Sequence, residues 1–197
     1  MKFAIVPAGL LAAAVLSLGT AAAGTASTYK QGAIKFTYPA GWSKVSTSDS
    51  RSLGQQLAAD AKGVVTLAAV GGVESVSKAS HSACVAVLAK MNFTAKYRTA
   101  LKGHESKFIT QFESGIKKSG SVKVTGSGTQ AFAGQSKAAE IQGTSKSGGT
   151  TIKDQFLIAI QSGDKAVDMA IFVVVPSSKW GKCGPALASI AASSRFS

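Results

Sequence analysis

Apolar and polar residues alternate over residues 34–38, where Lys35 and Thr37 stand between apolar neighbours. A period of two is typical of a strand that buries one face. A proline follows Tyr38 and ends the pattern, and a short turn then presents Trp42. We expect a half-buried strand here.

Helical and strand-like patterns follow this strand. Residues 52–62 carry apolar side chains at helical spacing and Gly63 comes next, which predicts a short helix with a glycine terminator. Residues 64–70 predict a strand that is broken by the two glycines after it. Residues 83–88 are a further apolar run, for which the pattern leaves strand and helix both open.

The strongest helical pattern covers residues 93–118. Its polar and charged residues surround one apolar stripe, which consists of Phe108, Ile109, Phe112 and Ile116. A Ser-Gly pair marks the end of the pattern. We therefore expect one long amphipathic helix.

Four strand-like runs then alternate with turns rich in Gly, Ser and Lys: residues 122–125, 138–143, 152–161 and 166–175. This order is typical of an antiparallel meander. The last two runs are apolar on both faces, so we expect them at the centre of a sheet. The Gly/Ser/Thr-rich patches at 125–129 and 143–151 are short enough to be loops.

The chain closes with one more helical segment. It is expected to begin near Gly184 and Pro185, because proline is favoured in the first turn of a helix. The predicted order is strand, helix, strands, long helix, meander and terminal helix. Such an order indicates an α+β fold.

The first 26 residues have the pattern of a Sec-type signal peptide. Lys2 supplies the charged start, residues 3–18 form an apolar stretch, and small residues offer cleavage after Ala23 or Ala26. A retained anchor is the alternative, but a membrane span needs about 20 apolar residues. We place cleavage after Ala26. Residues 27–197 are then one exported domain, periplasmic or secreted, with no transmembrane anchor after processing.

The mature chain is strongly basic. The full chain has 22 Lys and Arg residues, and removal of Lys2 leaves 21 against nine Asp and Glu, a net charge of +12. Only three of the basic residues are Arg, the side chain that suits bidentate recognition of phosphate and base edges. Outside the cytoplasm the available anions are lipid head groups, wall polymers, polysaccharides and acidic proteins. We therefore exclude nucleic acid as a partner.

A candidate anion-binding patch surrounds the expected long helix and its exit. It consists of Lys107, Lys117, Lys118 and Lys123. The alternative is that the charge serves solubility alone.

Cys84 and Cys183 are an even pair in a chain with an export signal. This combination predicts a structural disulfide bond. Redox or metal chemistry would need a Cys-x-x-Cys pair or histidines at ligand spacing, which His81 and His104 do not supply. We expect no metal and no other cofactor.

Catalytic motifs are missing from the sequence. There is no Gly-x-Ser-x-Gly elbow, no His-Glu-x-x-His helix and no phosphate-cradling glycine loop. Ser75 and Ser114 each precede a lysine by three residues, the spacing of a lysine-activated serine. Such matches arise by chance in a chain this rich in Ser and Lys. We expect a protein that is not an enzyme, with a hydrolase as the least favoured alternative.

Residues 36–42 read Phe-Thr-Tyr-Pro-Ala-Gly-Trp. This segment resembles the opening strand and turn of the PsbP/Mog1-like superfamily, which includes bacterial exported proteins. A glycine-led turn at 134–139, a corner at 175–180 that ends in Trp180, and a final helix ending at 194–196 extend the resemblance over most of the mature chain. The resemblance implies a single α/β/α sandwich domain around a central antiparallel sheet, and proteins that bind or assemble with partners instead of catalysing reactions. It also implies that Tyr38 and Trp42 lie at a corner of the core rather than on a ligand platform, with Trp180 as a further corner aromatic.

The expected function is therefore that of an exported, non-catalytic binding or assembly protein of the cell envelope. Its partner would be an envelope protein or an anionic envelope polymer. The alternative is an electrostatic binder of anionic envelope components, such as lipid head groups or wall polymer, through the Lys-rich surface. The sequence leaves the oligomeric state open.

Overall fold

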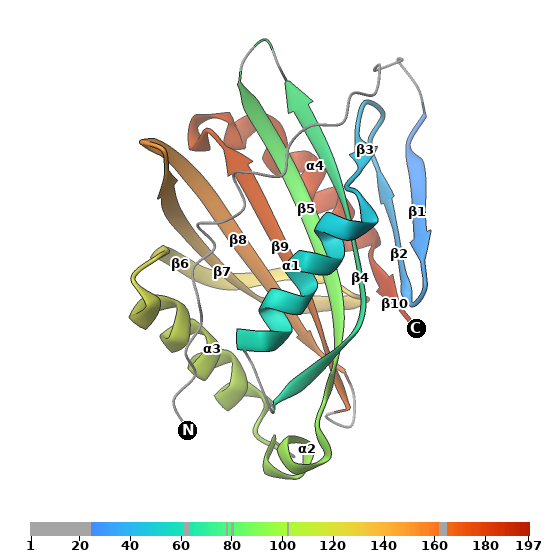
Figure 1. Cartoon of the computed structure of the whole chain (residues 1–197). Coiled ribbons are helices and arrows are strands. Elements are labelled where there is room, and N and C mark those ends of the chain that lie inside the picture. The colour runs from blue at the N-terminus through green and yellow to red at the C-terminus, as the bar shows by residue number, and fades with distance from the viewer. Residues whose placement is uncertain (1–24, 61–63, 78, 80, 102, 162–164) are drawn as a thin grey trace.

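Two antiparallel sheets organise the chain (Figure 1). The computed structural model describes residues 25–60, 64–77, 79, 81–101, 103–161 and 165–197. In these residues the large sheet has seven strands, in the order β3 (Ser43–Lys44), β4 (Val65–Ser77), β5 (Ser82–Phe93), β9 (Ala166–Val175), β8 (Thr150–Ile160), β7 (Gln135–Ser147) and β6 (Lys123–Phe132). The small sheet has three, in the order β1 (Ser27–Gln31), β2 (Ile34–Tyr38) and β10 (Arg195–Phe196).

Helices lie on both faces of the large sheet. One face carries α1 (Thr47–Asp60), α2 (Ala95–Leu101) and α3 (Glu105–Ser119), and the other carries α4 (Trp180–Ser193) together with the small sheet. In Figure 1, α1 and α3 stand in front of the sheet and α4 behind it. The described residues thus form one mixed α/β domain with a large antiparallel sheet and few helices.

The large sheet divides the core into two clusters. On the α3 face, Phe93 and Phe108 meet edge to face with ring centroids 5.3 Å apart. On the α4 face, Phe36 from the small sheet, Phe172 from β9 and Leu187 from α4 are fully buried together. The small sheet is therefore attached to the rest of the domain through its inner, apolar face.

The predicted meander is confirmed. β6, β7, β8 and β9 pair with one another in chain order. β9 is the fourth of the seven strands and buries every residue except its last, as expected for a central strand. Residues 83–88, for which the pattern left strand and helix open, belong to β5.

Glycines do not end strands at the places that the sequence predicted. The pair at 71–72 lies inside β4, where a Cβ on the second glycine would lie 2.7 Å from the Ala86 carbonyl oxygen. Residues 125–129 lie within β6, an edge strand with two register shifts. In the patch at 143–151, only two glycines form the turn between β7 and β8. These glycines permit close packing and edge irregularity as well as turns.

The long helix predicted over residues 93–118 is two helices. β5 extends to Phe93, α2 follows, and Gly103 with φ 74° lies between α2 and α3. The apolar stripe is correct for α3, whose Phe108 and Ile116 are buried, and Gly120 ends the helix with φ 69°. The left-handed backbone at Gly103 interrupts what the apolar spacing alone predicts to be continuous, whereas Gly120 ends α3 at the predicted Ser-Gly pair.

Two further helix boundaries and the chain's last element differ from the prediction. α1 begins at Thr47, five residues earlier than predicted, because the Ser46 hydroxyl accepts a hydrogen bond from the Asp49 N–H at 3.1 Å. α4 begins at Trp180, after a 3-10 helix, so Pro185 lies inside it. Arg195–Phe196 is a short strand that pairs with β2, and not the end of a helix.

Residues 1–24 of the expected signal segment, which spans residues 1–26, lie outside the described residues, as do Gly63 and the turn at 162–164. None of the helices in the described part of the chain combines the length and the hydropathy of a membrane span.

Candidate functional site

The predicted lysine patch lies on α3 and at the start of β6, and its members are spread out. Lys107 is in the first turn of α3 and Lys117 is in its last turn, ten residues later, a separation of about 15 Å along a helix axis. Lys118 and Lys123 are both exposed. The patch is thus spread along α3 and onto the start of β6 rather than gathered in a compact cluster.

One lysine of this patch is paired with a carboxylate. Lys117 Nζ lies 2.7 Å from Glu113 Oε1, one turn earlier on α3. Ser127 on β6 donates a hydrogen bond to the same oxygen at 3.0 Å. The hydrogen bond from Lys117 holds the pKa of Glu113 below its usual value, with a further contribution from Ser127. The patch therefore offers less free positive charge than its four lysines suggest, and its role in anion binding stays a prediction.

A second basic surface lies on the small sheet. Lys30 on β1 is directly opposite Lys35 on β2, and Lys35 is directly opposite Arg195 on β10. All three side chains are exposed. We name these three residues the basic row. The three strands that carry it contain no Asp or Glu, so no carboxylate from the same sheet offsets its charge.

The position of the basic row follows from strand alternation. Tyr29 and Phe36 point inward, where their rings stack with centroids 4.7 Å apart, so their neighbours in the strand point outward. Arg195 Nη1 donates hydrogen bonds to the carbonyl oxygens of Ala192 at 3.0 Å and Ser194 at 2.6 Å. The sequence signal for this surface was limited to Lys35, a polar position of a predicted half-buried strand.

The three predicted corner aromatics pack against the core on the α4 face, and all are partly buried. Tyr38 meets Phe36 edge to face, with ring centroids 6.3 Å apart. Trp180 has the Nζ atom of Lys153 over its ring, 4.8 Å from the centroid. These contacts are compatible with a corner role for Tyr38, Trp42 and Trp180, which stays a prediction.

A polar network extends from Trp180 across β8, β7 and β6. It comprises Gln130, Glu140, Gln142, Lys153 and Gln155. Its central acceptor is Glu140 Oε1, which receives hydrogen bonds from Gln142 Nε2 at 2.6 Å and from Gln155 Nε2 at 2.5 Å. No local motif predicted the network, because its members come from three strands.

Two buried carboxyl groups have raised pKa values. Burial raises the pKa of Asp154 to about 6, and the nearby Ser145 hydroxyl opposes the shift. Burial raises the pKa of Asp168 to about 6 as well, opposed by the Gln161 hydrogen bond and the charge of Lys90. The first lies on the α3 face of the sheet and the second on the α4 face. They therefore do not form an acid/base pair.

The remaining candidate residues lie on separate elements. Ser75 is on β4 and Ser114 is on α3, while His81 is in the turn between β4 and β5 and His104 precedes α3. In the described residues, no three His, Cys, Asp or Glu side chains are grouped as metal ligands.

Comparison with known proteins gives a parallel among solved structures. Neither a family model nor a curated protein sequence matches the chain. The fold is similar to that of LpqN from Mycobacterium tuberculosis, a protein described as involved in cell envelope biogenesis, with a TM-score of 0.52 and 12% sequence identity over 83% of each chain. At this identity the likeness shows a shared fold. Membership of the PsbP/Mog1-like superfamily stays a prediction.

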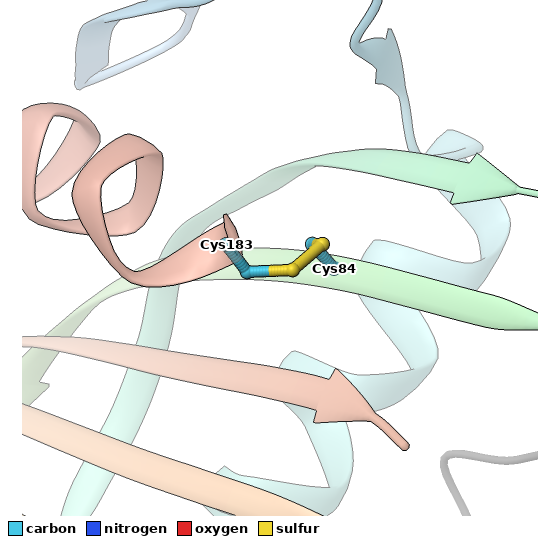
Figure 2. The surroundings of a disulfide bond; sticks show 2 residues. All are labelled: Cys84 and Cys183. Carbon is cyan, nitrogen blue, oxygen red and sulfur yellow. A yellow bond between two sulfur atoms is a disulfide. The ribbon is translucent and has the colours of Figure 1, made fainter. Parts of the chain in front are cut away.

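The predicted disulfide bond is present. Figure 2 shows Cys84 on the strand β5 bonded to Cys183 on the helix α4. The two Cα atoms are 5.9 Å apart, and the residues are separated by 99 positions in the sequence. A disulfide is typical of an oxidising compartment. The bond is compatible with an exported protein.

Proposed function

We propose that the mature chain is a non-catalytic binding protein of the cell envelope. The observation that carries this proposal is the fold shared with LpqN over 83% of both chains. LpqN is described as involved in cell envelope biogenesis, and the disulfide bond is compatible with that compartment. On this proposal the chain leaves the cytoplasm by the Sec route and belongs to the PsbP/Mog1-like superfamily.

The surroundings of one candidate nucleophile support a role in binding rather than catalysis. A lysine can activate a serine only when its amine is neutral. Lys117, three residues after Ser114, forms an ion pair with Glu113 at 2.7 Å, so its amine is engaged by a carboxylate. Ser114 therefore has no base at the expected spacing.

The proposal is tested by a pull-down from native envelope extract. The bait is the oxidised chain of residues 27–197, compared with a sample of the same chain unfolded by reduction, alkylation and heat, whose loss of structure is verified by circular dichroism. We expect the oxidised bait to retain envelope material, and a protein partner should remain bound at high salt. If the two samples retain the same material at every salt concentration, the folded domain has no specific partner and the proposal is wrong.

The alternative function, electrostatic binding of anionic envelope components, is favoured by one observation. The basic row presents three exposed cationic side chains on strands without Asp or Glu. Material held by such a surface would be released as salt rises, since screening weakens exposed charge interactions.

A further inference from the structure

We infer that the basic row is a docking surface for an anionic polymer of the envelope. This inference rests on the proposed envelope function and names a partner and a surface for it. The partner is a chain that carries an anionic group in each repeat, and the surface is the outer face of β1, β2 and β10.

The register of the small sheet places the three charges in a line. Lys30, Lys35 and Arg195 occupy directly opposed positions on adjacent strands, and neighbouring strands are about 4.8 Å apart. The row is therefore about 10 Å long. A polymer lying across the strands can place successive anionic groups along this line, whereas a single small anion can contact only part of it.

The arrangement is unfavourable for the isolated domain. Like charges that lie directly opposite each other destabilise a sheet, and no Asp or Glu on these strands offsets them. The small sheet is held by its inner face, where Tyr29 and Phe36 are buried. Arg195 also donates hydrogen bonds to carbonyl oxygens at the C-terminal end of α4, but packing through the inner face does not use Lys30 or Lys35, and an anionic partner would reduce the repulsion between them.

The composition of the surface favours a polymer over a bilayer. Proteins that lie on a membrane combine basic residues with apolar side chains that enter the lipid. The residues beside the row in the outer face are Thr28 and Thr37, which are opposite each other. Among the described residues the exposed large hydrophobic side chain is Val76, on β4 of the other sheet. The row therefore lacks an apolar group for insertion.

The lysines of α3 provide a matched comparison. One of them is paired with Glu113, and the others lie on a helix whose carboxylates are Glu105 and Glu113. If attraction depended only on net charge, removing charge from either surface would weaken binding equally. If the row is the docking surface, the two changes differ.

The experiment measures binding of inorganic polyphosphate, and separately of polygalacturonate, to the oxidised chain of residues 27–197 by titration calorimetry at low and high salt. The first variant is Lys30→Gln with Lys35→Gln, and the control variant, Lys107→Gln with Lys118→Gln, removes the same charge from α3. We expect the row variant to bind about tenfold more weakly at low salt with a shallower salt dependence, as loss of ion contacts requires. The control variant should bind within about twofold of the unmodified chain.

Several results would overturn the inference. Equal weakening by both variants would assign the binding to net charge. In a parallel titration with phosphatidylglycerol vesicles, binding that is lost in the row variant, without binding of either polymer, would assign the row to a membrane surface. If the chain binds neither polymer while the envelope pull-down still retains a partner, this inference fails and the proposed function stands. Thermal melting checks that the row variant is folded, and its melting temperature should not fall, because a like-charge contact has been removed.

Discussion

The hydroxyl group of Tyr29 lies over the backbone of Gly71, at the place where a side chain on that residue would begin. A Cβ built on Gly71 would be 2.1 Å from the Tyr29 hydroxyl oxygen and 2.6 Å from the ring carbon that bears it. Tyr29 belongs to β1 and Gly71 to β4. At this close approach the small sheet, which carries the basic row, packs against the large sheet.

Replacement of Gly71 by Ala should weaken the packing of the small sheet on the large sheet. The added methyl group overlaps a buried ring, and overpacking of this kind lowers the free energy of unfolding by about 1 to 3 kcal/mol. Urea unfolding at neutral pH measures the change. The matched control is Gly126→Ala on β6, where a Cβ would meet nothing within 4 Å. In a Tyr29→Ala background the same change at Gly71 should have little further effect, and an undiminished loss there would show that the ring is not the cause.

Local patterns predicted the strands well because a period of two or a continuous apolar run depends only on neighbouring residues. The same patterns misplaced the breaks at glycines. Gly71 is required by a contact with Tyr29, 42 positions away in the sequence, and no local pattern contains that information. The division between α2 and α3 was missed for a related reason, since Gly103 interrupts a segment whose apolar spacing continues through it.

The candidate surfaces show the same limit. Lys35 was recognisable as an outward position of β2, because alternation within a strand is local. Its two neighbours in the row come from β1 and β10, and the pairing of Arg195 with Lys35 joins opposite ends of the domain. The α3 lysines were easier to group because they are close in sequence, but the Lys117–Glu113 ion pair reduces their free charge.

Loss of the disulfide bond should destabilise the domain. The Cys84–Cys183 bond closes a segment of 99 positions, and in the chain-entropy model a loop of this length contributes about 4 to 5 kcal/mol through restriction of the unfolded chain. We expect the double variant Cys84→Ala with Cys183→Ala to unfold at markedly lower urea concentration. Reductant should shift the unfolding curve of the parent chain but leave that of the variant unchanged. If reductant does not shift the urea unfolding curve of the parent chain, the disulfide bond does not stabilise the domain as expected.

Truncation of Glu140 should weaken the polar network beside Trp180. Gln155 is 3% exposed and donates to Glu140 Oε1, so Glu140→Ala leaves a buried amide with one acceptor fewer. Loss of a partner for a buried polar group lowers the free energy of unfolding by about 1 to 3 kcal/mol. Glu140→Gln retains an oxygen acceptor and should be milder, as measured by urea unfolding. Equal losses in the two variants would mean that the carboxylate charge, and not the hydrogen bond, matters.

The buried carboxyl groups predict an unusual dependence of stability on pH. The pKa of Asp154 rises from 3.8 to about 6 in the folded chain because the side chain is buried, and the same applies to Asp168. Between these two pH values the folded chain holds a proton that the unfolded chain has lost. The free energy of unfolding from these groups therefore falls as pH rises through this window, and the loss is complete above it.

Asp154→Asn should remove its part of this pH dependence. Asp154 is 1% exposed and neither carboxylate oxygen has a hydrogen-bond partner at normal distance among the described residues. At about 1.4 kcal/mol for each unit of pKa shift, the variant should be more stable than the parent chain by about 2 to 3 kcal/mol at neutral pH. The two should converge at the acidic end of the window, as followed by urea unfolding across it. Because the Ser145 hydroxyl lowers the folded-state pKa of Asp154, Ser145→Ala should extend the upper end of the window to higher pH and leave its lower end unchanged. If the free energy of unfolding changes with pH in the same way for the parent chain and for Asp154→Asn, ionisation of the carboxyl group costs the folded chain little free energy. Burial would then not control its titration.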